Sequence, residues 1–178
     1  STTTIDVEDF ATSLTAGSVV FSNGSNLAQD NTNFSWDDTN DALTINDAII
    51  HTAGSVNNFF AGPSAGNFTI SAGHNTGVGS AALTSLTSGT LNTAVGSASL
   101  DNETTGGYNT AMGAAALGAQ QGASYNTAVG RAAGLNITTG SYNTVLGGLA
   151  LDAETTGGSN IAIGYGALSA QNGVGGTV

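Results

Sequence analysis

The sequence predicts an all-β protein, built as a parallel β-solenoid of seven coils that follows a small β-rich N-terminal module. Three observations lead to this prediction. A phrase of the type Asn-Thr-small-apolar-Gly recurs seven times, always 17 residues apart. The 178 residues include 27 glycines and one proline, and only 7% are charged. Because glycine destabilises a helix by about 1 kcal/mol relative to alanine, we expect short strands and turns.

Two invariant columns define the repeat. An asparagine opens each phrase, and a glycine follows four positions later. The asparagines are Asn58, Asn75, Asn92, Asn109, Asn126, Asn143 and Asn160, and the glycines are Gly62, Gly79, Gly96, Gly113, Gly130, Gly147 and Gly164. Consecutive units at one fixed spacing indicate coils that are too small to fold alone and pack on their neighbours. We therefore interpret both columns as structural: the asparagines as stacked amides, the glycines as turns with positive φ.

Each coil is expected to hold two short strands, Thr-Ala-Val before the glycine turn and Ala-Ala-Leu after it. The apolar residue three positions after each asparagine, such as Val129, and the leucine eight positions after it, such as Leu117, are expected to fill the interior. The small-residue pairs, such as Ala115-Ala116, form a continuous stripe. Such a stripe permits close approach of another backbone, which suggests self-association.

The N-terminal third has a different composition. Residues 1–50 contain the only tryptophan and eight of the twelve acidic residues. Short apolar runs, "SVVF", "FSW" and "ALTI", alternate there with Asn, Gly and Asp turns, which indicates strands. We predict a β-rich module over 1–50, a junction over 51–57 and the repeat domain over 58–178, with Phe59 and Phe60 capping the first coil.

The charge balance excludes several classes of partner. The formal net charge is −11, lysine is absent, and Arg131 is the only basic residue. Nucleic acids and anionic membrane surfaces require clustered basic side chains, so neither is an expected partner. No apolar run approaches the 18 or so residues of a membrane span. Cysteine is absent, so no disulfide or thiolate metal site forms. This composition suits an extracellular or virion surface.

Acidic residues are the first candidates for chemistry. Asp37, Asp38 and Asp41 lie close enough in sequence to suggest calcium, but the central glycine and final glutamate of an EF-hand loop are missing. An Asx-rich hairpin turn is the favoured alternative. The pairs Asp101 with Glu103 and Asp152 with Glu154 resemble paired carboxylates. We expect both pairs in solvated surface turns and without a catalytic role.

The remaining candidates are histidines and tyrosines. His51 and His74, the only two histidines, are too few to supply a metal site by themselves. Tyr108, Tyr125 and Tyr142 directly precede three of the repeat asparagines. A tyrosine row could stack on the sugar rings of a receptor glycan, but a packing ladder along the coils is the favoured alternative. We predict no cofactor.

The repeats resemble the β-roll repeats of trimeric autotransporter adhesin heads and, more closely, the "NTAxGxxAL…TTG" repeats of bacteriophage fibre and bacterial surface proteins. The resemblance covers residues 58–176. It implies a left-handed roll and a homotrimer in which small residues face a shared axis. Adhesin heads have a shorter unit, and the neck motif and membrane anchor of that family are absent from this sequence. A phage-like fibre is therefore the favoured member of this group.

The expected function is a non-enzymatic fibre or spike segment on a virion, which spaces or presents a host-attachment surface. Its partners would be two further copies of itself, other fibre or virion proteins, and a host receptor or glycan. A trimeric adhesin on a bacterial cell surface is the alternative. Ice binding is a third class, suggested by one row of threonines that ends at Ile161: Thr76, Thr93, Thr110, Thr127 and Thr144.

Overall fold

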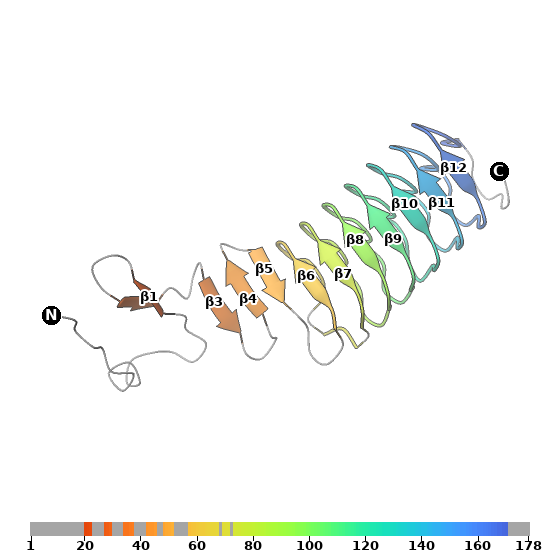
Figure 1. Cartoon of the computed structure of the whole chain (residues 1–178). Helices are drawn as coiled ribbons and strands as arrows, with labels where there is room; N and C mark the ends of the chain where they lie inside the picture. Colours follow the sequence, from red (N-terminus) through yellow and green to blue (C-terminus); the bar gives the residue numbers. More distant parts are fainter. Residues whose placement is uncertain are drawn as a thin grey trace.

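The computed structural model describes residues 57–67, 69–71 and 73–170, together with the backbone of five earlier strands (Figure 1). No helix occurs among these residues. The earlier strands are β1 (Val20–Ser22), β2 (Leu27–Gln29), β3 (Phe34–Asp37), β4 (Ala42–Ile45) and β5 (Ala48–His51). The strands of the repeat are β6 (Phe59–Ala61), β7 (Thr76–Val78), β8 (Thr93–Val95), β9 (Thr110–Met112), β10 (Thr127–Val129), β11 (Thr144–Leu146) and β12 (Ile161–Ile163).

The repeat strands form one parallel sheet in sequence order, so the chain is a β-solenoid, as predicted. Each strand pairs with the equivalent strand 17 residues along, for example Thr110 with Thr127 and Thr127 with Thr144. Figure 1 shows the coils stacked side by side along one axis. Backbone hydrogen bonds continue between coils outside the strands, such as Ala98 N–H to the Ser80 carbonyl at 2.8 Å. Each coil is therefore held by its neighbours along most of its length.

Each coil contains one strand, and the predicted second strand is wrong. The Ala-Ala-Leu segment is a series of turns in which alternate residues adopt left-handed backbone conformations. Ala115 has φ 56° and Leu117 has φ 52°, and equivalent residues of neighbouring coils have similar values. Such angles are uncommon for residues with a Cβ. They are held here by inter-coil hydrogen bonds, including Leu117 N–H to the Ala133 carbonyl at 3.0 Å.

The interior is lined by the middle residue of each strand and by the second alanine and the leucine of each turn segment. Ala111, Ala116 and Leu117 are fully buried. The residue three positions after the asparagine points outward instead: Met112 is 46% exposed and Leu146 is 48% exposed. The prediction that this column fills the roll is therefore wrong. The buried asparagine fixes the alternation of the strand, so the second residue after it faces inward and the third outward.

Two glycines interrupt the leucine column where a larger side chain from elsewhere occupies the space. Phe60 fills the first coil, and a Cβ on Gly66 would collide with its ring. A Cβ on Gly77, at the middle of β7, would lie 2.9 Å from Phe60 Cδ1. In the fifth coil, a Cβ on Gly134 would lie 2.9 Å from Ile137 Cδ1. These glycines thus leave space that larger interior side chains, Phe60 and Ile137, occupy.

The N-terminal edge of the solenoid is covered by backbone pairing. β5 pairs antiparallel with β6, with His51 opposite Phe60, and β4 and β3 follow by further antiparallel pairing. Of the two residues predicted to cap the first coil, Phe60 is fully buried in it and Phe59 is 43% exposed. The predicted boundaries at residues 50 and 57 stay predictions. At the opposite end, β12 is the last of the strands that the structure describes.

Candidate functional site

The asparagine column runs through the interior as a hydrogen-bonded ladder. Asn109 is fully buried, and its side-chain Nδ2 donates to Asn92 Oδ1 at 3.0 Å and to the Ala123 carbonyl at 2.9 Å. Its Oδ1 accepts the Asn126 backbone N–H at 2.9 Å. The amide therefore bonds to the coil on either side of it. Because Asn109 is fully buried and both of its Nδ2 hydrogens are used, this side chain offers no surface to a ligand.

The glycine column forms a second contact line between coils. These glycines adopt φ values between +118° and +138°. Successive glycines approach so closely that a Cβ on Gly113 would lie 2.5 Å from the Gly130 carbonyl oxygen. Both the backbone angle and the distance exclude other residues. Like the asparagines, the glycines serve the stacking of coils.

Glu103 and Glu154 are fully buried, which overturns their expected place in solvated turns. Glu103 Oε1 accepts backbone N–H groups of Thr104, Thr105, Gly106 and Gly122 at 2.6–3.0 Å. Its Oε2 accepts Gln120 Nε2 at 2.8 Å. Converging backbone N–H groups in a turn form an anion-binding nest, and here the anion belongs to the chain itself. The carboxylate is therefore a structural group enclosed by its donors.

Glu154 repeats the contacts within the turn three coils later. Its Oε1 accepts N–H groups of Thr155, Thr156 and Gly157 at 2.6–3.0 Å. The partner of Glu103 in the proposed carboxylate pair, Asp101, is only partly exposed. Burial raises the pKa of Asp101, while the backbone N–H groups of Asp101 and Asn102 oppose that change. The common phrase "ETTGG" was the sequence signal for this motif, since the donors follow the glutamate directly.

We expect Glu103→Ala to lower the free energy of unfolding by about 2–4 kcal/mol, because several N–H donors lose a charged acceptor at once. Asp101→Ala removes a carboxylate from the same turn and is the matched control, with an expected loss below about 1 kcal/mol. Urea unfolding followed by circular dichroism measures both. Equal shifts of the two unfolding midpoints would contradict the role assigned to Glu103.

The three tyrosines form a stacked column on the surface. The ring centroids of Tyr108 and Tyr125 are 4.8 Å apart with planes at 7°, and those of Tyr125 and Tyr142 are 5.0 Å apart with planes at 2°. All three side chains are about half exposed. Sugars stack on ring faces, yet the facing sides of these rings contact one another. The geometry favours a packing ladder, and a receptor contact through ring edges and hydroxyls stays a hypothesis.

The most extensive candidate interaction surface is the outer face of the parallel sheet. We define the outer sheet face as the first and third residues of strands β6–β12. One column is mainly threonine and the other is Ala, Val, Met, Leu or Ile, and neither contains a charged residue. Six of the large hydrophobic side chains exposed on the described chain belong to it: Phe59, Val78, Met112, Leu146, Ile161 and Ile163. An uncharged surface that contains a row of exposed apolar side chains is typical of protein contacts.

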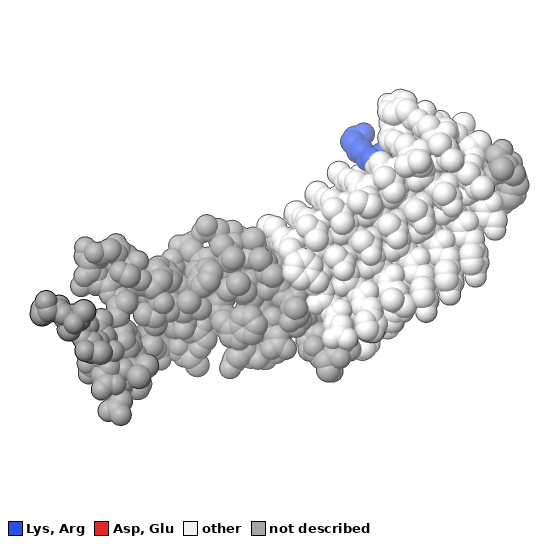
Figure 2. All heavy atoms as spheres, viewed as in Figure 1, with Lys and Arg blue, Asp and Glu red and all other residues white. Residues whose placement is uncertain are grey.

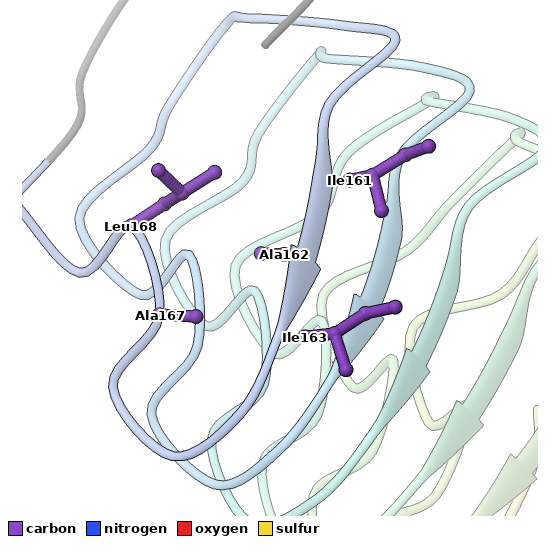
Figure 3. Close-up of a pocket in the computed structure, with 5 residues that line it drawn as sticks. All are labelled: Ile161, Ala162, Ile163, Ala167 and Leu168. Carbon is purple, nitrogen blue, oxygen red and sulfur yellow. The ribbon is translucent and has the colours of Figure 1, made fainter. Parts of the chain in front are cut away.

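Charge is sparse on the rest of the described surface. Arg131, the residue after the repeat glycine Gly130, is the one basic residue of the sequence. Among the described residues in the view of Figure 2, one basic side chain projects from the rod and no acidic side chain is visible. The four acidic residues of the described repeats are Asp101, Glu103, Asp152 and Glu154. Two of these are the enclosed glutamates. The surface therefore offers little for recognising a charged ligand.

The remaining predicted candidates are the aspartates near β3 and the histidines. Asp37 is the last residue of β3, opposite Ala42 in an antiparallel pair, while Asp38 and Asp41 lie outside the described residues. His74 is an exposed residue with φ 65° before β7. Within the described parts of the chain, no three His, Cys, Asp or Glu side chains are grouped as metal ligands. No helix of sufficient length and hydropathy for a membrane span occurs in those parts either.

The comparisons with known proteins add no relative. No protein-family model matches the chain, and neither the curated proteins nor the solved structures contain a match to it.

Proposed function

We propose that this chain is a non-enzymatic structural segment of a fibre or spike on a virion surface. It would be a left-handed roll that assembles as a homotrimer with other fibre proteins and spaces or presents a host-attachment surface. The main support for the proposal is that the buried polar side chains of the repeat form hydrogen bonds within the rod. The buried amides and the carboxylate of Glu103 bond coil to coil, which favours a stiff rod.

The outer sheet face is the surface that best supports trimer formation. The sequence suggested the alanine pairs, but the second alanine of each pair, such as Ala116, is fully buried inside its own coil. The strand alanine, such as Ala111, is buried as well. The outer sheet face instead presents uncharged side chains in rows along the rod. Burying such rows against copies of themselves removes apolar surface from water at about 25 cal/mol per Å².

We expect the purified chain to have the mass of a trimer, and Met112→Glu to shift it to the monomer while the far-UV circular dichroism stays unchanged. Met112 lies in the middle of the outer sheet face and is 46% exposed, so a glutamate there is tolerated by the isolated coil. In an interface it would be a buried unpaired charge, which costs several kcal/mol. Light scattering after size exclusion measures the mass.

Thr139→Glu is the matched control, because it adds the same charge at an exposed turn residue outside the outer sheet face. It is expected to leave the trimer intact. A monomeric wild-type chain at micromolar concentration would overturn the trimer. Loss of the trimer in both variants would show that net charge, and not the outer sheet face, controls assembly.

A trimeric adhesin of a bacterial cell surface is the alternative role for the same rod. Localisation distinguishes the two, since immunogold labelling of virions supports the fibre and labelling of cell envelopes supports the adhesin. Ice binding is a minor alternative, favoured by the register of the threonine row, in which Thr93 pairs with Thr110 and Thr110 with Thr127. The adjacent outward column is apolar, so the row is one threonine wide. Thermal hysteresis in solution would favour this alternative over the fibre.

A further inference from the structure

The tyrosine column, which consists of Tyr108, Tyr125 and Tyr142, is regular in its backbone as well as in its rings. The three residues have φ values of 60°, 62° and 65°, in the left-handed region that is uncommon for residues with a Cβ. Each donates its backbone N–H to the preceding coil, as Tyr108 does to the Thr90 carbonyl at 2.9 Å and Tyr125 to the Gly107 carbonyl at 3.1 Å. Because the three share one conformation and one hydrogen-bond pattern, their side chains leave the rod in the same direction.

This regularity holds equivalent atoms of neighbouring rings close together. The ring centroids are 4.8 Å apart between Tyr108 and Tyr125 and 5.0 Å apart between Tyr125 and Tyr142, with nearly parallel planes in both pairs. In such a stack each ring carbon lies at about the centroid distance from the same carbon of the next ring. These carbons include the two that are ortho to the phenolic oxygen, where a phenol radical forms new bonds.

The column is accessible from solution. All three side chains are about half exposed, so a reagent reaches the ring edges while the ring faces stay in contact with one another. The same exposure leaves room for two neighbouring rings to tilt toward each other. Cysteine is absent from the sequence, so no thiol of the chain competes as an electron donor and no disulfide can link the coils.

We propose that the tyrosine column is a site of oxidative cross-linking, at which Tyr125 forms a carbon–carbon bond with Tyr108 or Tyr142. The co-reactant is a peroxide, acting through a peroxidase as one-electron oxidant. Each of two neighbouring phenols gives up one electron and its hydroxyl proton, and the two radicals join through one ortho carbon of each ring. The hydrogen on each joined carbon then moves to the phenolic oxygen, which restores both phenols. The peroxide takes up the two electrons and two protons and becomes two water molecules.

The middle position of Tyr125 is essential to this reaction within one chain. Tyr108 and Tyr142 are 34 residues apart, which is two coils, and the ring of Tyr125 lies between theirs. Holding two phenols in contact converts their coupling into a step within one molecule, which at low protein concentration is faster than coupling between molecules. The bond would join two consecutive coils and close a loop between residues 17 apart, which restricts the unfolded chain.

The test uses the full chain at micromolar concentration with hydrogen peroxide and a peroxidase. We expect dityrosine fluorescence in the single-chain band of a denaturing gel, and an intact mass that is lower by two hydrogen atoms. Arg131 is the only basic residue, so trypsin cleaves the denatured product once, between Tyr125 and Tyr142. A bond from Tyr125 to Tyr142 keeps the two fragments together, and a bond to Tyr108 leaves the fluorescence in the N-terminal fragment. Either pattern supports the proposal.

Tyr125→Phe keeps an aromatic ring in the stack but removes its phenol, and it is expected to lower the dityrosine yield within single chains by about tenfold or more. Tyr165→Phe is the matched control. Tyr165 follows Gly164, and no other tyrosine of the sequence lies in that column, so this variant is expected to keep the wild-type yield. Circular dichroism verifies that both variants keep the solenoid. Equal yields within single chains of the two variants would overturn the proposal, as would dityrosine that forms in the wild type only between chains.

Discussion

Gly113→Val is expected to lower the free energy of unfolding by more than about 4 kcal/mol, more than the other substitutions proposed for the rod. Gly113 has φ +137°, a conformation that valine adopts only with strain. A Cβ there would also lie 2.5 Å from the Gly130 carbonyl oxygen and 3.0 Å from the Arg131 nitrogen. Since both contacts are to backbone, relief requires separating two coils. Thermal unfolding followed by circular dichroism measures the loss.

Gly164→Val distinguishes the effect of backbone strain from the effect of the close contact between coils. Gly164 has φ +118°, but a Cβ on it would meet nothing within 4 Å. It therefore reports the backbone strain alone, for which a loss of about 1–3 kcal/mol is expected. Tyr125→Ala, which removes a surface ring from the tyrosine column, is expected to cost less than Gly113→Val as well. If Gly113→Val melts at the same temperature as Tyr125→Ala, the tight contact between glycines is not a determinant of stability.

Asn92→Asp is expected to produce the second largest loss, about 3–5 kcal/mol at neutral pH. Asn92 is fully buried, and its Nδ2 donates to the Gly106 carbonyl at 2.9 Å. Aspartate keeps the oxygen that accepts the Asn109 N–H, but it places a buried carboxylate oxygen against that carbonyl. The substitution changes few atoms, so the loss is assigned to the missing donor and the unpaired charge.

The effect is expected to depend on pH. A carboxyl group in this position favours the protonated form, which raises its folded-state pKa above the unfolded value of about 3.9. The free energy of unfolding of the variant is therefore closest to that of the wild type below about pH 4. The difference between the two grows as the pH rises above the unfolded pKa toward the raised folded-state pKa. Asn57→Asp, at an exposed turn residue, is the matched control with an expected change below about 0.5 kcal/mol. A constant difference between Asn92→Asp and wild type from pH 3 to pH 7 would contradict the assignment.

Most of the correct predictions followed from the period of the repeat. Because Asn92, Asn109 and Asn126 recur at a fixed spacing, parallel stacking in register follows without knowledge of the path inside a coil. The strand positions followed for the same reason. The glycine column was also predictable, since a residue without a side chain at every turn indicates either positive φ or close packing. Gly113 shows both.

The path inside a coil was not predictable from the same pattern. A strand of three residues is too short to display alternation, so the inward residue Ala128 and the half-buried Val129 could not be told apart by periodicity. Val129 is the more hydrophobic of the two, and it was assigned to the interior on that ground. The Ala-Ala-Leu segment was wrongly predicted as a strand for another reason. Alanine and leucine rarely adopt positive φ, so Ala115 and Leu117 indicated a strand although inter-coil bonds hold them in turns.

The burial of the two glutamates could not be predicted from the composition of their segments. An acidic residue among threonines and glycines is usually solvated, and the sequence favoured that assignment for Glu103 and Glu154. Both are buried because the N–H groups of the "TTG" turn and, for Glu103, the side chain of Gln120 in the next coil surround the carboxylate. Those donors converge only when the turn and its neighbour are folded together.

The sequence by itself determined the architecture of this protein: an all-β solenoid, its 17-residue period, its parallel register and its two invariant stacking columns. These properties depend on spacing along one chain, which a repeat displays directly. Only the tertiary structure decided which side chains line the roll, which carboxylates are enclosed, and which residues of each strand face outward. Those outcomes depend on the direction of each Cβ and on the position of the neighbouring coil. The Cβ directions and the positions of neighbouring coils are set when the coils stack. Only then do hydrogen bonds between coils select the backbone conformation of each turn.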